Sequence, residues 1–299
     1  MKYLNLIRWP NVLMTLITQV IILYWFLPES NADLTLALWQ QLVIIFSTCC
    51  IVAAGNVIND IYDADVDRIN KPDQVIVGRL LSIKSSNRLY IGLTFTAVVG
   101  GFVVANSIDR AGMASIFIVV SFLLYYYATT LKKQLVIGNV VISLLVGLVM
   151  LLTAVVELYP ALNDANQSEQ GKVLLLLTGF AVLAFFVNLL REWIKDAQDI
   201  NGDLAGGRSS LPLVLGKQRA CRVMAVYTLT LAAVLAYWFT NIFYQLSNTF
   251  YYSLFAIIAP LMYIGIRLWN VENDKELKIL SLVCKLVLLA GIVLIGLSQ

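Results

Sequence analysis

Six aspartates with a repeated spacing are the residues of this sequence best suited to chemistry. Asp60, Asp63 and Asp67 lie at positions i, i+3 and i+7, which places three carboxylates on one face of a helix. A second run repeats this spacing, and its members are Asp196, Asp199 and Asp203. Carboxylates held close together repel one another unless a cation offsets their charge. We therefore expect the two runs to face each other, and all six aspartates to be catalytic residues that bind metal.

Each acidic run begins near the end of a long apolar stretch, and basic residues follow it. Asn56 and Asn59 extend the first stripe back into the apolar stretch, and the dipeptide Lys71-Pro72 is expected to end that helix. A solvated, charge-balanced loop would also explain this pattern. The strict register of the aspartates favours a binding site instead. Several basic side chains near the two runs are suited to neutralising a phosphate, namely Arg68, Lys71, Lys132, Lys195 and Arg208.

The composition is that of a membrane protein. Of the 299 residues, 60% are hydrophobic and only 13% are charged, far from the usage of soluble globular domains. We predict an all-α fold with one domain over residues 1–299, in which nine transmembrane helices surround a central cavity. The expected helices cover residues 10–27, 38–58, 89–107, 111–130, 135–156, 173–192, 221–239, 250–267 and 279–297.

The basic residues predict the orientation of these helices. With nine spans, all but two of the 21 lysines and arginines fall on one side of the membrane, and the exceptions are Arg110 and Lys172. The positive-inside rule makes the crowded side cytoplasmic, so the N-terminus is expected in the cytoplasm. We expect an integral protein of the inner (cell) membrane, with the aspartates on its cytoplasmic side. The first apolar run is read as a retained span because no small-residue cleavage site follows it.

The rarest residue types exclude several classes of site. The sequence contains no histidine, which removes Ser-His-Asp triads and histidine metal sites. Its four cysteines form no C-x-x-C pair and are expected to be small apolar residues within helices.

Mg²⁺ prefers oxygen ligands, and proteins commonly hold it with one or two carboxylates plus the phosphates of a substrate. Two aspartate runs at one membrane face therefore predict a Mg²⁺-bound diphosphate, and an apolar cavity would accept its lipid tail. These features together describe the ionisation of a lipid diphosphate, in which metal ions stabilise the departing pyrophosphate. An acceptor then captures the carbocation, and no protein nucleophile is required.

The two acidic motifs resemble those of the UbiA-type intramembrane prenyltransferases. The first is Asn59-Asp60-x-x-Asp63-x-x-x-Asp67, and the second is Lys195-Asp196-x-x-Asp199-x-x-Gly202-Asp203. The resemblance covers essentially the whole chain and implies an all-helical fold around a cavity, with Mg²⁺-dependent transfer of a prenyl group. It also implies that Arg8, Asn11, Tyr127, Lys132 and Arg208 lie near the substrate.

Within the family, the segment from Arg191 to Asp203 looks most like the digeranylgeranylglyceryl phosphate synthases. That resemblance implies a geranylgeranyl diphosphate donor and a geranylgeranylglyceryl phosphate acceptor. One departure is Gln74-Val75, where many members have Arg-Pro, and it leaves an aromatic quinone precursor as an alternative acceptor. The pattern of charges is also compatible with a divalent-cation transporter or with a non-catalytic protein that binds prenyl lipids. We expect membrane lipid and no nucleic acid among the binding partners.

Overall fold

The computed structural model describes residues 1–298, and this part of the chain is helical throughout apart from its turns and loops. Nine helical segments within it are long and apolar enough to cross a membrane, which confirms the predicted number of spans. Their bounds are Trp9–Glu29, Leu38–Asn70, Ile83–Ser107, Ala111–Thr129, Ile137–Leu158, Gln167–Gln198, Lys217–Phe243, Ser247–Trp269 and Asp274–Leu297. The helices that carry the acidic runs extend well past the predicted ends, because polar residues continue the helical backbone beyond the apolar stretch.

The chain divides into two compact units. The first comprises Met1–Lys132 and Leu148–Leu177, and the second comprises Lys133–Gly147 and Thr178–Gln299. Two long helices, α7 (Ile137–Leu158) and α8 (Gln167–Gln198), contribute residues to both units. The expectation of a single domain remains a prediction.

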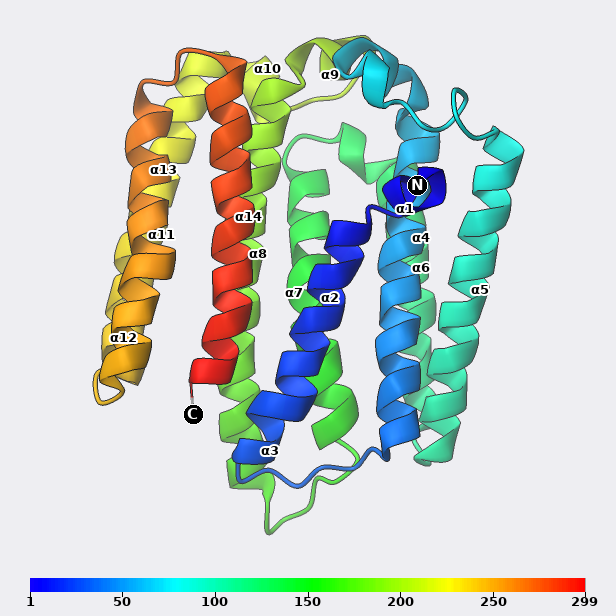
Figure 1. Ribbon diagram of the computed structural model, residues 1–299, viewed down its shortest axis with the longest axis vertical. Helices are drawn as coiled ribbons and strands as arrows, with labels where there is room; N and C mark the ends of the chain where they lie inside the picture. Colours follow the sequence, from blue (N-terminus) through cyan, green and yellow to red (C-terminus); the bar gives the residue numbers. More distant parts are fainter. Residues whose placement is uncertain (299) are drawn as a thin grey trace. The chain divides into compact units, whose positions relative to one another are not determined.

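Helix α4 is the centre of the first unit, where it packs against α2, α5 and α6. The helices of this unit, in order, are α1 (Lys2–Leu6), α2 (Trp9–Ile21), η1 (Ile22–Phe26), α3 (Leu27–Glu29), α4 (Leu38–Asn70), η2 (Pro72–Gln74), α5 (Ile83–Ser107), η3 (Ala111–Met113), α6 (Ala114–Thr129) and η4 (Leu131–Lys133), the last of which ends at the first residue of the second unit. Figure 1 shows α4 and α5 side by side. A glycine lets α5 approach α6 closely, since a Cβ atom on Gly101 would lie only 2.3 Å from the Phe117 ring. Large apolar side chains on the outer faces, such as Phe95 and Phe122, are exposed, as expected for surfaces that contact lipid.

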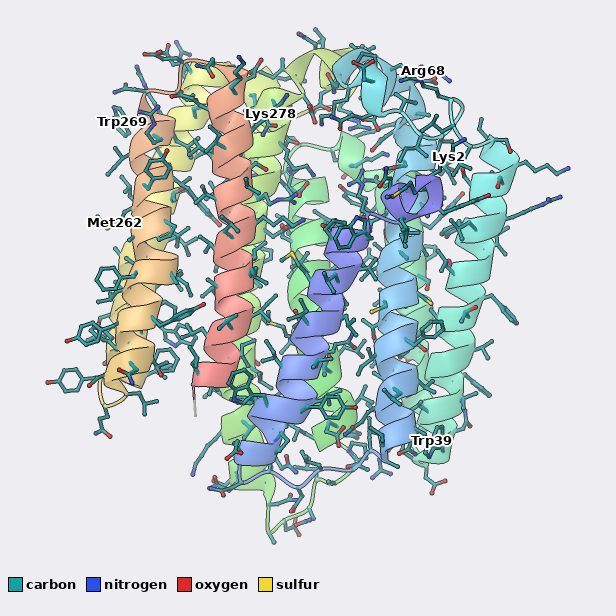
Figure 2. The ribbon with its side chains drawn as sticks, in the orientation of Figure 1. Lys2, Trp39, Arg68, Met262, Trp269 and Lys278 are labelled. Atoms are coloured by element: carbon teal, nitrogen blue, oxygen red, sulfur yellow. The ribbon has the colours of Figure 1, made fainter. Side chains whose placement is uncertain are left out.

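The two ends of α4 are fixed by different signals. At its start, the Gln40 side chain accepts a hydrogen bond from the Ala37 backbone N–H at 2.7 Å. At its end, Lys71 leaves the helical conformation immediately before Pro72, because a residue that precedes proline avoids the α region. Figure 2 shows Arg68 and Trp39 at opposite ends of this helix. The predicted stop at Lys71-Pro72 is confirmed.

The second unit contains the later helices, which pack in antiparallel pairs. They are α9 (Ile200–Ala205), α10 (Leu211–Leu215), α11 (Lys217–Phe243), α12 (Ser247–Ser253), η5 (Leu254–Ile258), α13 (Ala259–Trp269) and α14 (Asp274–Leu297). Helix α11 packs along α13 (Figure 1). Aromatic residues fill the interior, where the Phe180 and Trp238 rings meet edge to face at 5.8 Å between centroids. This core supports the α8 residues that lead into the second acidic run.

Candidate active site

The first three aspartates lie on one uninterrupted helix, as their spacing predicts. Asp60, Asp63 and Asp67 all belong to α4, and none of them is fully exposed. We call these three residues the α4 acidic stripe. Asp63 is the most buried, with 8% of its surface accessible. A carboxylate buried to this degree requires a charged or polar partner.

Arg8 supplies one such partner from the start of the chain. Its Nη2 donates to Asp60 Oδ1 at 2.6 Å. Burial lowers the pKa of the Arg8 guanidinium, but the carboxylates of Asp60, Asp63 and Asp67 raise it by more, so the pKa lies above its ordinary value. All three members of the α4 acidic stripe therefore act on one cation.

The backbone around Arg8 is arranged to make this contact. Arg8 precedes α2 with φ 51° and ψ 60°, a left-handed conformation that is costly for a residue with a side chain. Short helix α1 is attached to α4 nearby, because Leu6 packs with Val57 and Asn56 Nδ2 donates to the Ile7 carbonyl at 3.0 Å. Asn56 thus serves the site by anchoring the segment that carries Arg8.

Lys132 supplies the second partner from a distant part of the sequence. Its Nζ donates to Asp63 Oδ1 in a short contact and to Asn59 Oδ1 at 3.3 Å. The Lys132 side chain is only 6% exposed, and the 3₁₀ turn η4 that follows α6 holds it over α4. Breaking a buried ion pair by removing one partner typically costs about 3–5 kcal/mol. The structure thus brings Arg8, Asn56, Asn59 and Lys132 together at the α4 acidic stripe, and their contact with a substrate remains a prediction.

The other predicted substrate residues of this unit lie near the ends of α2, α4 and α6. Arg68 donates to Asp65 at 2.7 Å, and both side chains are largely exposed. Lys71 caps α4 through its backbone N–H, which donates to the Asp67 carbonyl at 2.8 Å. Asn11 and Tyr127 are half-buried, and the Asn11 N–H donates to the Arg8 carbonyl at 2.8 Å. Their contact with a substrate remains a prediction.

The second acidic run has the same spacing but a different backbone. Asp196 lies near the end of α8, Asp199 precedes α9 with φ −103° and ψ 19°, and Asp203 lies within α9. The helix is therefore interrupted inside the run, which is not one continuous stripe. Asp203 is 4% exposed, and its Oδ1 accepts from Arg208 Nη1 at 3.4 Å.

Residues that the sequence pattern did not single out also hold this second run. Asn139 on α7 donates from Nδ2 to Asp196 Oδ2 at 2.8 Å. Glu192 accepts from Lys195 at 2.8 Å and from Arg191 at 3.0 Å, so the predicted phosphate ligand Lys195 is paired within α8. The signal for Asn139 was its position as an amide in an otherwise apolar stretch.

The donor atoms of both clusters suit Mg²⁺, which prefers carboxylate and amide oxygens to sulfur or nitrogen. Among residues 1–298, no three His, Cys, Asp or Glu side chains are grouped closely enough to form a metal site by themselves. Basic side chains instead hold Asp60, Asp63 and Asp203. A divalent ion would have to share these carboxylates with the cations that bind them in the structure.

A match to a protein family shows what kind of protein carries this site. The sequence profile described as the UbiA prenyltransferase family matches residues 15–289. The chain belongs to the UbiA prenyltransferase family. Both acidic runs lie within the matched residues. The family resemblance inferred from the motifs is confirmed.

Relatives of this UbiA family member include named synthases. Digeranylgeranylglyceryl phosphate synthase of Methanopyrus kandleri is 39% identical over 184 residues, which cover 62% of this chain and 61% of the relative. The synthase of the same name from Methanothermobacter thermautotrophicus is 31% identical over 232 residues, which cover 78% of this chain and 73% of the relative. The matched segment thus spans about three fifths of the length of the first of these relatives.

A solved structure has the same fold over nearly the full length. A UbiA homolog from Archaeoglobus fulgidus bound to DMAPP and Mg²⁺ aligns with a TM-score of 0.60 and 18% identity, and the alignment covers 99% of each chain. At this identity the likeness supports the fold, and it confirms the predicted all-helical membrane architecture.

Proposed function

We propose that this UbiA family member transfers a geranylgeranyl group from its diphosphate to geranylgeranylglyceryl phosphate, and that the reaction requires Mg²⁺. The observation that carries the proposal is the α4 acidic stripe, whose buried Asp63 and half-buried Asp60 and Asp67 share one helix face beside Arg8 and Lys132. The second run contributes a further set of oxygen ligands. The names of the two relatives described above support the choice of donor and acceptor.

The residues of the first unit have separate tasks in this proposal. The aspartates would hold the ions that bind the diphosphate. The side-chain oxygen of Asn59, which accepts from Lys132 at 3.3 Å, would be a further oxygen ligand. Arg8 and Lys132 pair with the acids, and both are placed to neutralise phosphate oxygens once a metal takes over the carboxylates. When bound, Mg²⁺ stabilises the negative charge that develops on pyrophosphate as the allylic C–O bond breaks.

In the second unit, Asp196, Asp199 and Asp203 are proposed to bind the same diphosphate through Mg²⁺. Arg208 is positioned by its backbone N–H, which donates to the Asp203 carbonyl at 2.9 Å, so its guanidinium stays beside the acidic group. Lys71 of the first unit supplies further positive charge. We propose that the reaction takes place at the cytoplasmic side of the cell membrane, because nearly all lysines and arginines fall on that side.

Product formation by the purified protein tests the proposal. Incubation with geranylgeranyl diphosphate, Mg²⁺ and geranylgeranylglyceryl phosphate is expected to release pyrophosphate and to form the diprenylated lipid, detected by mass spectrometry. Adding an aromatic quinone precursor as a competing acceptor distinguishes the two branches, and exclusive prenylation of the aromatic compound would overturn the lipid assignment.

Two conservative variants provide the matched control. Asp63→Asn removes a buried charge from the α4 acidic stripe, whereas Asp65→Asn changes a neighbouring aspartate that is exposed and off the stripe. Activity is expected to fall sharply in Asp63→Asn and to stay within about twofold in Asp65→Asn. Absence of turnover with every acceptor, together with unchanged diphosphate binding in Asp63→Asn, would favour a non-catalytic lipid-binding protein.

A further inference from the structure

A second group of charged side chains lies on α8, immediately before the acidic run in sequence. Lys195 follows Arg191 by four residues and Glu192 by three, spacings that bring side chains together on a helix, and Glu192 accepts from Arg191 at 3.0 Å and from Lys195 at 2.8 Å. All three side chains are partly buried, with 22%, 13% and 30% exposed. They belong to the apolar span Gln167–Gln198, where ionisable residues are costly and commonly functional.

Helix α14 packs against this part of α8 in an antiparallel register. Gln198 Nε2 donates to the Leu277 carbonyl at 3.3 Å, and a Cβ atom on Gly291 would lie 3.3 Å from Leu183. Arg191 lies between these two contacts and acts electrostatically on Cys284 and Lys285 of α14. Lys285 of α14 is therefore a fourth charged residue of this group. Figure 1 shows helices α8 and α14.

The charges of this group do not balance. Arg191, Lys195 and Lys285 are positive, and Glu192 is the acid that pairs with the first two. Asp196 is next to Lys195 in sequence but accepts from Asn139 on α7. In addition, Arg191 Nε is buried and has no hydrogen-bond partner within residues 1–298. A buried donor without an acceptor is unfavourable, so the group has the properties of an anion site.

We propose that Arg191, Lys195 and Lys285 bind the phosphate monoester of the lipid acceptor. This inference rests on the proposed function and deepens it, because it separates the acceptor phosphate from the diphosphate that the aspartates bind. A planar guanidinium and two ammonium groups match the shape and charge of a phosphate monoester. Arg191 precedes the end of α8 by seven residues, or about 10 Å along the helix, so the anion that reaches it is expected to be carried by a lipid.

Binding measurements on the full-length protein in detergent test this inference without requiring turnover. The probes are radiolabelled geranylgeranylglyceryl phosphate, the same lipid without its phosphate, and geranylgeranyl diphosphate with Mg²⁺. Arg191→Gln and Lys285→Gln are each expected to weaken binding of the phosphorylated lipid about tenfold or more, the usual loss for one charge-assisted hydrogen bond. Binding of the dephosphorylated lipid and of the diphosphate is expected to change less than about twofold.

Two further variants exclude a general structural effect. Lys278→Gln removes an exposed lysine from the same helix, α14, and is expected to bind all three probes as the parent protein does. Arg191→Lys keeps the charge and is expected to restore part of the affinity. Circular dichroism on each variant verifies that the helices remain folded.

Each contrary result has a defined meaning. Equal weakening of diphosphate binding in Arg191→Gln would assign the residue to the donor and overturn the inference. Equally tight, Arg191-dependent binding of phosphatidylglycerol in nanodiscs would make the group a site for bulk lipid headgroups and also overturn it, as would binding of inorganic phosphate with similar affinity. If the protein binds the phosphorylated acceptor through Arg191 but turns over no substrate, the proposed reaction fails while the phosphate site stands.

Discussion

The two acidic runs have the same spacing, but their carboxylates are held in different ways. The α4 acidic stripe lies on an unbroken helix, and its partners Arg8 and Lys132 are 52 and 69 residues away in sequence. In the second run the backbone turns at Asp199, and the basic partner of Asp203 is only five residues away. The first run therefore depends on cations from distant parts of the chain, whereas the second combines a local turn and a local cation with one distant amide, Asn139.

This difference assigns a physical task to each run. A straight helix holds its carboxylates in fixed relative positions, so the long-range cations determine whether the charges are tolerated. A turn between two helices can change the direction of Asp199 relative to Asp196 by small backbone rotations. We expect the α4 acidic stripe to be sensitive to charge changes and the second run to be sensitive to backbone changes.

Removing the metal is expected to have the largest effect, since both runs depend on it in the proposed reaction. EDTA in excess should reduce product formation to background, and added Mg²⁺ should restore it. The measurement is pyrophosphate release at saturating donor and acceptor. Full turnover in the chelator would exclude a metal from the reaction. The aspartates of both runs would then not act as metal ligands.

Neutralising one aspartate in each run is the next largest change. Asp63→Asn and Asp199→Asn are each expected to lower kcat about 10³-fold, the scale seen when preorganised charge stabilisation is lost. If both runs serve one reaction, the double variant should lose little more than the worse single variant, because residues that act as a unit are non-additive. Independent, multiplicative losses in the double variant would argue for separate roles.

Removing the basic partners compares the two runs directly. Lys132→Met leaves the buried Asp63 without its ion pair and is expected to reduce activity and to destabilise the protein by about 3–5 kcal/mol. Arg208→Met removes a longer contact at 3.4 Å, and the loss of stability should be smaller, about 1.5–3 kcal/mol, the range for a hydrogen bond to a charged group. Thermal unfolding in EDTA, followed by circular dichroism, measures both. Similar losses in the two variants would mean that the second run depends on its cation as strongly as the first.

The sequence was sufficient to predict the nine spans and the stop of α4, because long apolar stretches and a Lys-Pro pair act locally. It also predicted that Asp60, Asp63 and Asp67 share a helix face. The break at Asp199 was not predicted, since the spacing i, i+3, i+7 reads the same whether or not the helix continues. The pairing of Asp63 with Lys132 was not predicted, because the periodicity of one helix carries no information about which residue of another helix packs over it.

Asn139 and Glu192 show a second reason for incomplete prediction. Neither residue belongs to an acidic run, so a search for metal ligands passes over both. Yet Asn139 holds Asp196, and Glu192 holds Arg191 and Lys195. A polar residue in an apolar span is the available signal, because burying it without a partner is unfavourable.

The smallest expected effect tests the local turn of the second run. Gly207 has φ +63°, and no atom of the described residues lies within 4 Å of the position that a Cβ would occupy, so Gly207→Ala introduces backbone strain without a steric clash. A left-handed residue with a side chain costs about 1–2 kcal/mol, and the turn that carries Arg208 is expected to shift. Activity should fall a few-fold, whereas Gly206→Ala, at φ −81°, should be close to the parent protein.

Steady-state kinetics with varied geranylgeranyl diphosphate separate the two ways in which Gly207→Ala can act. A higher KM with unchanged kcat indicates that Arg208 has lost contact with the diphosphate, whereas a lower kcat indicates that the aspartates themselves have moved. An equal response of Gly206→Ala would show that the strain at Gly207 is not the cause. The second run would then depend on packing, as the α4 acidic stripe does. The two runs would differ only in how far away in sequence their basic partners lie.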